Sequence, residues 1–90
     1  MLDLTCGLGV DARALAMRFR EVVTLERNEV LAELTRENFR RLGINNVTVL
    51  TTDAESYVQH CTARFDWVYA LNRICKACFE FVLYSFFFLI

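Results

Sequence analysis

Short apolar runs alternate with segments of helical periodicity along residues 1–70, which is the pattern of strands and helices in turn. The predicted strands lie at 1–5, 22–25, 47–50 and 65–70. The predicted helices lie between them, at 11–20, 29–42 and 54–60. Strands that are apolar on both faces and alternate with helices belong to parallel sheets with right-handed crossovers. The sequence therefore predicts an α/β fold: a partial, doubly wound parallel sheet of about four strands.

Polar residues mark the ends of the predicted helices, and apolar residues mark their buried faces. Asn28 and Asp53 are expected to cap the second and third helices, and Gly43 to end the second. The buried face expected in the first helix consists of Ala12, Leu15, Ala16 and Phe19. The one expected in the second helix consists of Leu31, Leu34, Asn38 and Leu42.

Residues 71–90 differ in composition from residues 1–70, since five of the eight phenylalanines lie in 79–88. This apolar run is shorter than the roughly 20 residues of a membrane-spanning helix, and Glu80 interrupts it, so no membrane contact is predicted. It fits a strand at the open edge of the fourth strand, or a short aggregation-prone segment. We predict an atypical apolar tail at 71–90, of non-native, frameshift-like sequence, behind a partial domain at 1–70 that is truncated at both ends.

Charge and cysteine content narrow the classes of function. Ten basic and eleven acidic residues give a net charge of −1, which leaves no electrostatic footprint for unassisted nucleic-acid binding. Arg36, Arg40 and Arg41 are expected on a solvated helix face, or in a weak contact to an anionic substrate.

Four scattered cysteines without a signal peptide predict a reducing, cytoplasmic compartment. The pair Cys75-x-x-Cys78 lacks a second pair of ligands, so no metal site is predicted.

The stretch 3–11, Asp-Leu-Thr-Cys-Gly-Leu-Gly-Val-Asp, is predicted to be a strand end, a glycine turn and a helix start. Backbone N–H groups at such a turn suit the polar part of a nucleotide-like ligand. Gly7 and Gly9 fit this role because glycine permits a positive φ and the close approach of a ligand. Glu26 ends the second strand and Asp53 follows the third. Both carboxylates are therefore expected in the crevice at the carboxyl ends of the strands.

The turn at 3–9, with Glu26 and Asp53 at their strand ends, resembles the class I S-adenosylmethionine-dependent methyltransferases over residues 1 to about 70. The resemblance implies a Rossmann-like fold, S-adenosylmethionine as the small-molecule cofactor, and methyl transfer to an unknown acceptor. RNA-modifying members look most similar, which makes RNA a candidate acceptor. The backbone of residues 6–9 would line the methionine and ribose parts of the cofactor. The cofactor-binding residues that the resemblance implies are Asp3, Cys6, Gly7, Leu8, Gly9, Glu26, Asp53 and Ala54.

The implied side-chain roles each have a structural alternative. Asp3 would face the ammonium group of the cofactor's methionine part, or would merely bond N–H groups of the loop. Glu26 would accept from both ribose hydroxyls, because one carboxylate can take two donors, or would pair with Arg27 or solvent. Asp53 would accept from the adenine amino group, beside the backbone N–H of Ala54, or would only cap the third helix.

Several other polar and aromatic residues near the turn receive no catalytic role. Cys6 is expected to be a small residue of the turn rather than a nucleophile, since no base lies beside it in the sequence. Asp11 serves either the start of the first helix or the cofactor. Trp67 and Tyr69 are expected in the core rather than as a stacking platform.

A dinucleotide-binding fold is the main competing hypothesis, because residues 7–12 satisfy G-x-G-x-x-A and Glu26 lies about 20 residues further on. Asp3 in the first strand and Asp53 after the third favour the methyltransferase. After the fourth strand the chain lacks the acidic or Asn/Asp-Pro-type motif that lines the acceptor site of many members, so catalytic residues stay unassigned. We therefore predict a methyltransferase fragment without activity of its own. The alternatives are an inactive cofactor-binding fragment and an NAD(P)-binding domain.

Overall fold

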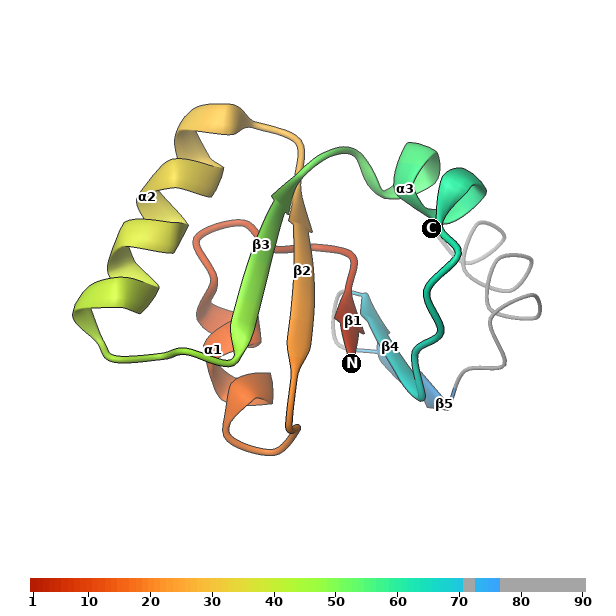
Figure 1. Ribbon diagram of the computed structural model, residues 1–90, viewed down its shortest axis with the longest axis horizontal. Helices are drawn as coiled ribbons and strands as arrows, with labels where there is room; N and C mark the ends of the chain where they lie inside the picture. The colour runs from red at the N-terminus through yellow and green to blue at the C-terminus, as the bar shows by residue number, and fades with distance from the viewer. Residues whose placement is uncertain (71–72, 77–90) are drawn as a thin grey trace.

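The computed structural model describes residues 1–70 and 73–76, which form one sheet with helices packed on it (Figure 1). Its strands are β1 (Leu2–Asp3), β2 (Val22–Glu26), β3 (Val47–Thr51), β4 (Trp67–Ala70) and β5 (Arg73–Lys76). Its helices are α1 (Val10–Ala16), α2 (Glu29–Arg41) and α3 (Ala54–His60). The four strands and three helices expected from the sequence are all present, with ends that differ from the prediction by a few residues.

The strands are arranged in the order β3-β2-β1-β4-β5. β1 pairs with β2 and with β4, and β2 pairs with β3, all in parallel. The predicted doubly wound parallel sheet is thereby confirmed. The chain leaves β1 towards β2 and β3 and then crosses back to β4, so the strand order reverses beside β1. A reversal of this kind opens a crevice at the carboxyl ends of the strands.

β5 adds a fifth strand that the predicted set of about four did not include. It pairs antiparallel with β4, so residues 73–76 follow the interpretation of the tail as a strand at that edge. Residues 71–72 and 77–90 lie outside the described residues. The predictions for the remainder of the tail, and for Cys75 and Cys78 as a pair, therefore lie outside them as well.

The helices cover the sheet from both sides, α1 and α2 on one face and α3 on the other (Figure 1). The core on the first face comprises Cys6, Ala12, Leu15, Val22, Ala32, Phe39, Val49 and Tyr69. The core on the α3 face comprises Leu2, Leu4, Leu25, Val58, Val68 and Ala70. The expected face of α1 is confirmed by the burial of Ala12 and Leu15. Tyr69 lies in the core as expected, whereas Trp67 is 37% exposed beside the ring of Phe19.

The buried face of α2 differs from the prediction by about one residue. Leu34 and Leu42, expected inside, are each 52% exposed, and the buried residues are Ala32, Thr35 and Phe39. The physical reason is the glycine turn after β1, where Gly9 packs closely against Thr35 and Phe39, so that this face of the helix is turned towards the core. The ends of the helix follow the prediction. The side chain of Asn28 accepts the backbone N–H of Leu31 at 3.1 Å, and Gly43 has a φ of 70° just after the helix.

The arginines of α2 divide into two groups. Arg40 and Arg41 bind Glu37 on the solvated face, as expected. Arg36 instead reaches β3, where its side chain donates to the carbonyl of Val49 at 2.7 and 3.0 Å. Because β3 is an edge strand, this contact covers part of an open row of backbone acceptors.

Candidate functional site

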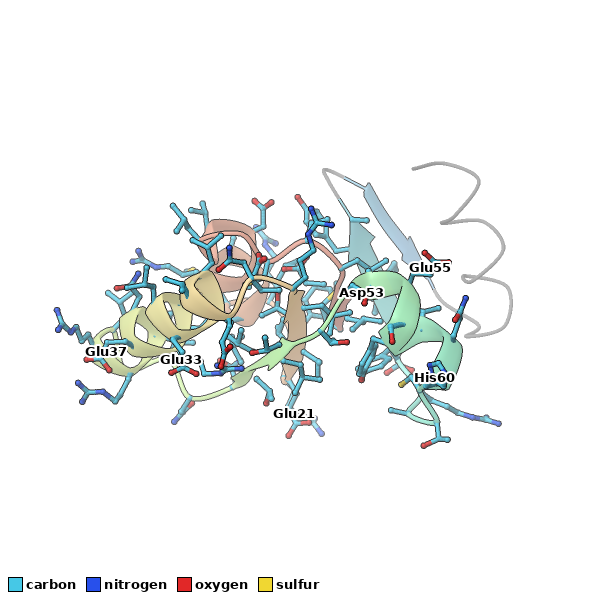
Figure 2. All side chains as sticks on the ribbon, turned by 90° about the horizontal axis from the view of Figure 1, so that it is seen from above. Glu21, Glu33, Glu37, Asp53, Glu55 and His60 are labelled. Carbon is cyan, nitrogen blue, oxygen red and sulfur yellow. The ribbon has the colours of Figure 1, made fainter. Side chains whose placement is uncertain are left out.

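A cleft of about 860 Å³ opens at the carboxyl ends of β1, β2 and β3. This volume lies within the range of cofactor and small-molecule pockets, roughly 300–1,000 Å³. Figure 2 shows two of its carboxylates, Asp53 and Glu55, together at the start of α3. The residues that line the cleft are Leu4, Thr5, Cys6, Gly7, Leu25, Glu26, Arg27, Thr52, Asp53, Ala54 and Glu55.

The structure brings most of the expected cofactor-binding residues to this cleft, but not all of them. Those that line it are Cys6, Gly7, Glu26, Asp53 and Ala54. Those that do not line it are Asp3, Leu8 and Gly9. Leu8 is 62% exposed on the outside of the turn, whereas Asp3 and Gly9 are buried beneath it. The turn thus has a surface in the cleft and a layer below that supports it.

Glycine is needed at positions 7 and 9 of the turn for different structural reasons. Gly7 has a φ of 52°, and a Cβ at this position would meet nothing within 4 Å, so its backbone is open to the cleft. Gly9 has a φ of 84°, and a Cβ there would lie 2.7 Å from the ring of Phe39 and 2.8 Å from Thr35. Gly9 is therefore required by the packing of α2 under the turn. Thr35 also donates its hydroxyl to the carbonyl of Gly7 at 3.2 Å, which fixes the turn to α2.

Glu26 connects three segments at the end of β2. Its Oε2 accepts the backbone N–H of Gly7 at 3.1 Å, and its Oε1 accepts the N–H of Asn28 at 3.0 Å. No ion pair with Arg27 is present in the described part of the chain, so the alternative of a Glu26–Arg27 pair is not what the structure shows. Each carboxylate oxygen has two lone pairs, so each can accept one more donor from the cleft.

Asp53 caps α3 as predicted, since its Oδ1 accepts the backbone N–H of Ser56 at 2.7 Å. Within the described residues, its Oδ2 makes no hydrogen bond, and the side chain is exposed at the cleft. Ala54 is the first residue of α3, where backbone N–H groups have no partner inside the helix. Capping therefore uses one of the two oxygens, and the other stays available.

Asp3 is fully buried, and both of its oxygens are hydrogen-bonded. Oδ2 accepts the hydroxyl of Thr24 at 2.7 Å, and Oδ1 accepts the backbone N–H of Thr5 at 3.0 Å and its hydroxyl at 3.3 Å. Burial raises the pKa of Asp3, and these hydrogen bonds oppose the increase. The structural alternative, bonds to the loop, is the arrangement present. Direct contact of Asp3 with a cofactor stays a prediction.

Cys6 lines the cleft with its thiol buried among the side chains below the turn. Burial raises the pKa of this thiol, so it is held in the neutral form, which is a poor nucleophile. The interpretation of Cys6 as a small residue of the turn fits this environment. Across the described residues, no group of three His, Cys, Asp or Glu side chains is placed to hold a metal ion.

Six residues of the cleft were not among the expected cofactor-binding residues, namely Leu4, Thr5, Leu25, Arg27, Thr52 and Glu55. Each of them adjoins an expected cofactor-binding residue in the sequence. Their closeness to a strand end was therefore the signal that could have identified them. Arg27 is the only cation among the described residues of the cleft, against three carboxylates.

Among the residues that the structure describes, no helix has the length and apolar character to cross a membrane.

Comparisons with known proteins identify the family of the chain. A family model described as a methyltransferase domain matches residues 1–83. Ribosomal RNA small subunit methyltransferase J of Francisella tularensis subsp. novicida is 32% identical over 77 residues, which cover 77% of this chain and 32% of that protein. The 23S rRNA (uracil(1939)-C(5))-methyltransferase RlmD of Alkalilimnicola ehrlichii is 47% identical over 53 residues, which cover 59% of this chain and 12% of that protein.

A solved structure shows the same fold. It is a putative methyltransferase from Streptococcus mutans, SMU.1697c, in complex with SAH, with a TM-score of 0.68 and 19% identity. The match covers 93% of this chain and 52% of the other. The chain thus spans about a third or less of the two curated relatives and about half of the solved protein.

Proposed function

The chain belongs to the methyltransferase family, and on that premise we propose that it binds S-adenosylmethionine and forms the cofactor-binding part of a methyl-transferring enzyme. The family match favours this class over the dinucleotide-binding alternative, which the glycine turn alone left open. The observation that carries the proposal is Glu26, whose two oxygens are fixed at the cleft by backbone N–H groups and can each take a further donor.

The ribose of the cofactor is assigned to Glu26. Vicinal hydroxyls present two donors to one acceptor group, and a carboxylate matches this pair better than a single carbonyl does. The adjacent N–H groups of Gly7 and Asn28 keep the carboxylate in place, so it does not have to be ordered by the ligand. The open backbone at Gly7 permits close approach of the sugar and of the methionine chain.

The adenine ring is assigned to the start of α3. Asp53 accepts one bond from Ser56 through Oδ1, and Oδ2 is available for the exocyclic amino group. The backbone N–H of Ala54 is a donor for a ring nitrogen. A donor and an acceptor side by side match the edge of adenine, which carries both.

The charge of the cleft supports a cationic ligand. Three carboxylates and one guanidinium line it, whereas the sulfonium group gives the cofactor a permanent positive charge. When bound, S-adenosylmethionine supplies an electrophilic methyl group on its sulfur. The chain's contribution is to fix the ribose and adenine so that the methyl group has one defined position, since such positioning is a major source of rate enhancement.

Calorimetric titration of the 90-residue chain tests the proposal. We expect S-adenosylmethionine and S-adenosylhomocysteine to bind, and NAD to bind more weakly or not at all. Glu26→Gln should lower the affinity for S-adenosylmethionine and for S-adenosylhomocysteine. The matched control is Glu21→Gln, which changes an exposed carboxylate just before β2. Tighter binding of NAD would establish the dinucleotide alternative, and binding of no ligand by the wild type would establish an inert fragment.

We further propose RNA as the methyl acceptor of the whole enzyme. The support is that the curated relatives described above are named as ribosomal RNA methyltransferases. Disruption of the locus in its own cell should remove one methylated nucleotide from hydrolysed total RNA, measured by mass spectrometry. An unchanged set of methylated nucleotides would contradict an RNA acceptor without affecting the cofactor proposal.

A further inference from the structure

β3 forms one edge of the sheet, and among the described residues no strand lies on its outer side. The bonds at the two ends of its pairing with β2 use the carbonyl of Asn46 and the backbone N–H of Thr52. Successive residues of a strand turn their backbone groups to opposite sides, so the even-numbered residues here face β2. The residues whose N–H and C=O groups point away from the sheet are therefore Val47, Val49 and Thr51.

This outer row of β3 is complementary to itself. If a second copy of β3 ran antiparallel to the first, a two-fold axis could pass beside Val49. Val49 would then face its own counterpart, and Val47 would face Thr51 of the second copy. Each such pair exchanges two N–H···O bonds. The strand reads Val-Thr-Val-Leu-Thr, without a charge and rich in β-branched residues, which favours strand pairing.

Arg36 of α2 lies across the centre of this row. Its Nε and Nη2 donate to the carbonyl of Val49 at 3.0 and 2.7 Å, and Nη2 also donates to the hydroxyl of Thr51 at 2.9 Å. Glu33, one turn earlier, forms an ion pair with the same guanidinium. Figure 1 shows α2 alongside β3 at this edge. The guanidinium thus occupies the acceptor through which the two-fold pairing would be centred.

The other arginines near the end of α2 show that this position is not general for the helix. Arg40 and Arg41 pair with Glu37, and their side chains are 71% and 72% exposed. The side chain of Arg36 is 36% exposed, because it lies against the strand. A neighbouring strand would have to displace this charged donor from the carbonyl that it binds. Hydrogen bonds from a charged group are among the stronger ones in proteins, so the displacement is unfavourable.

We propose that the edge of β3 is a dimerisation surface that takes a second copy of this chain as an antiparallel strand, and that Arg36 keeps this surface closed in the wild type. A second copy is the partner that the row itself specifies, since its donors and acceptors match under a two-fold axis. The proposal concerns a surface outside the cleft and does not depend on the cofactor.

Sedimentation equilibrium of the 90-residue chain tests this role. Arg36→Ala opens the carbonyl of Val49, so the association constant for dimer formation should rise about tenfold above that of the wild type. Arg36→Lys retains a charged donor at this position and should raise it less. Arg40→Ala is the matched control, because it removes an arginine of the same helix that does not contact β3, and it should change nothing.

A second variant locates the contact. Thr51→Pro removes an outward N–H group without removing a bond to β2, so in the Arg36→Ala background it should return the association constant to the wild-type value. Self-association through any other part of the chain would be equal in all variants. Hydrogen exchange gives an independent measurement, since the amides of Val47, Val49 and Thr51 should be slowed in concentrated Arg36→Ala. Equal association constants for wild type and Arg36→Ala, or a dimer without this protection, would overturn the proposal.

Discussion

Three carboxylates lie at the carboxyl ends of consecutive parallel strands. Asp3 is below the turn, and Glu26 and Asp53 are at the cleft. Asp3 is fully buried and accepts from side chains and backbone around β1 and β2. Glu26 and Asp53 are more exposed, and within the described residues they accept hydrogen bonds from backbone N–H groups of adjoining segments. The same chemical group thus stabilises the fold in one position and remains available to a ligand in the other. Burial, more than residue type, makes the difference.

Asp3→Ala is expected to have the largest effect on stability. It removes the acceptor for the buried Thr24 hydroxyl and for the Thr5 amide, which should lower the free energy of unfolding by about 3 kcal/mol. Urea denaturation followed by circular dichroism measures this loss. Asp3→Asn retains one acceptor oxygen and should lose less, which gives a value if the alanine variant does not fold. A loss no larger than that of Glu21→Ala would contradict the buried role.

The two glycines extend the contrast between support and cleft. Gly9→Ala should lower the free energy of unfolding by about 2–3 kcal/mol, because strain at positive φ is added to the collision with Phe39. Gly7→Ala meets no neighbouring atom, so its loss should be about 1 kcal/mol, from φ alone. Thermal unfolding of the two variants compares them directly. Equal melting temperatures would refute the distinction between the two positions.

Glu26→Gln should change affinity more than stability. The amide retains one acceptor oxygen for the chain but loses the charge and one acceptor for the ribose, so affinity for S-adenosylhomocysteine should fall about tenfold. Calorimetry gives the affinity, and urea denaturation of the same sample gives the stability. Glu29→Gln, an exposed carboxylate in the first turn of α2, is the matched control. A loss of stability as large as that of Asp3→Ala would contradict this prediction, because Glu26 would then mainly stabilise the fold, as Asp3 does.

The pH dependence of unfolding should show the smallest effect. Because burial raises the pKa of Asp3 above its ordinary 3.8, the folded chain keeps this proton to a higher pH than the unfolded chain. Stability relative to Asp3→Asn should therefore be greatest below about pH 3.8 and fall as pH rises through the raised pKa.

For Glu37 the dependence of stability on pH has the opposite sign. Hydrogen bonds from Arg40 and Arg41 lower the pKa of Glu37 to about 2, so its contribution is lost as pH falls below 4.5. Urea titrations at several pH values test both slopes.

Local signals made the elements and the strand-end residues predictable. Asn28, Gly43 and Asp53 act on the backbone within a few residues of themselves, so their roles as caps and stop follow from the sequence. Glu26 was found because it ends an apolar run. These positions depend on neighbours along the chain and on one rule about parallel strands.

What the sequence did not reveal depends on partners far along the chain. The burial of Asp3 is set by Thr24, 21 residues away, and the position of Asp11 by Tyr69, 58 residues away. The predicted buried face of α2 was off by about one residue, since Thr35 and Phe39 pack against the turn at Gly9 whereas Leu34 and Leu42 are exposed. Periodicity alone cannot rank two neighbouring faces when the deciding contact comes from another element.

The two hydrogen bonds of Glu26 bear on the kinetics of ligand capture. They join β2, the turn at Gly7 and the start of α2 through contacts that the chain makes by itself. The ordering of this corner therefore belongs to folding, and a ligand has few side chains left to immobilise. Association should then be a single, fast step, with differences between ligands expressed mainly in how slowly they leave.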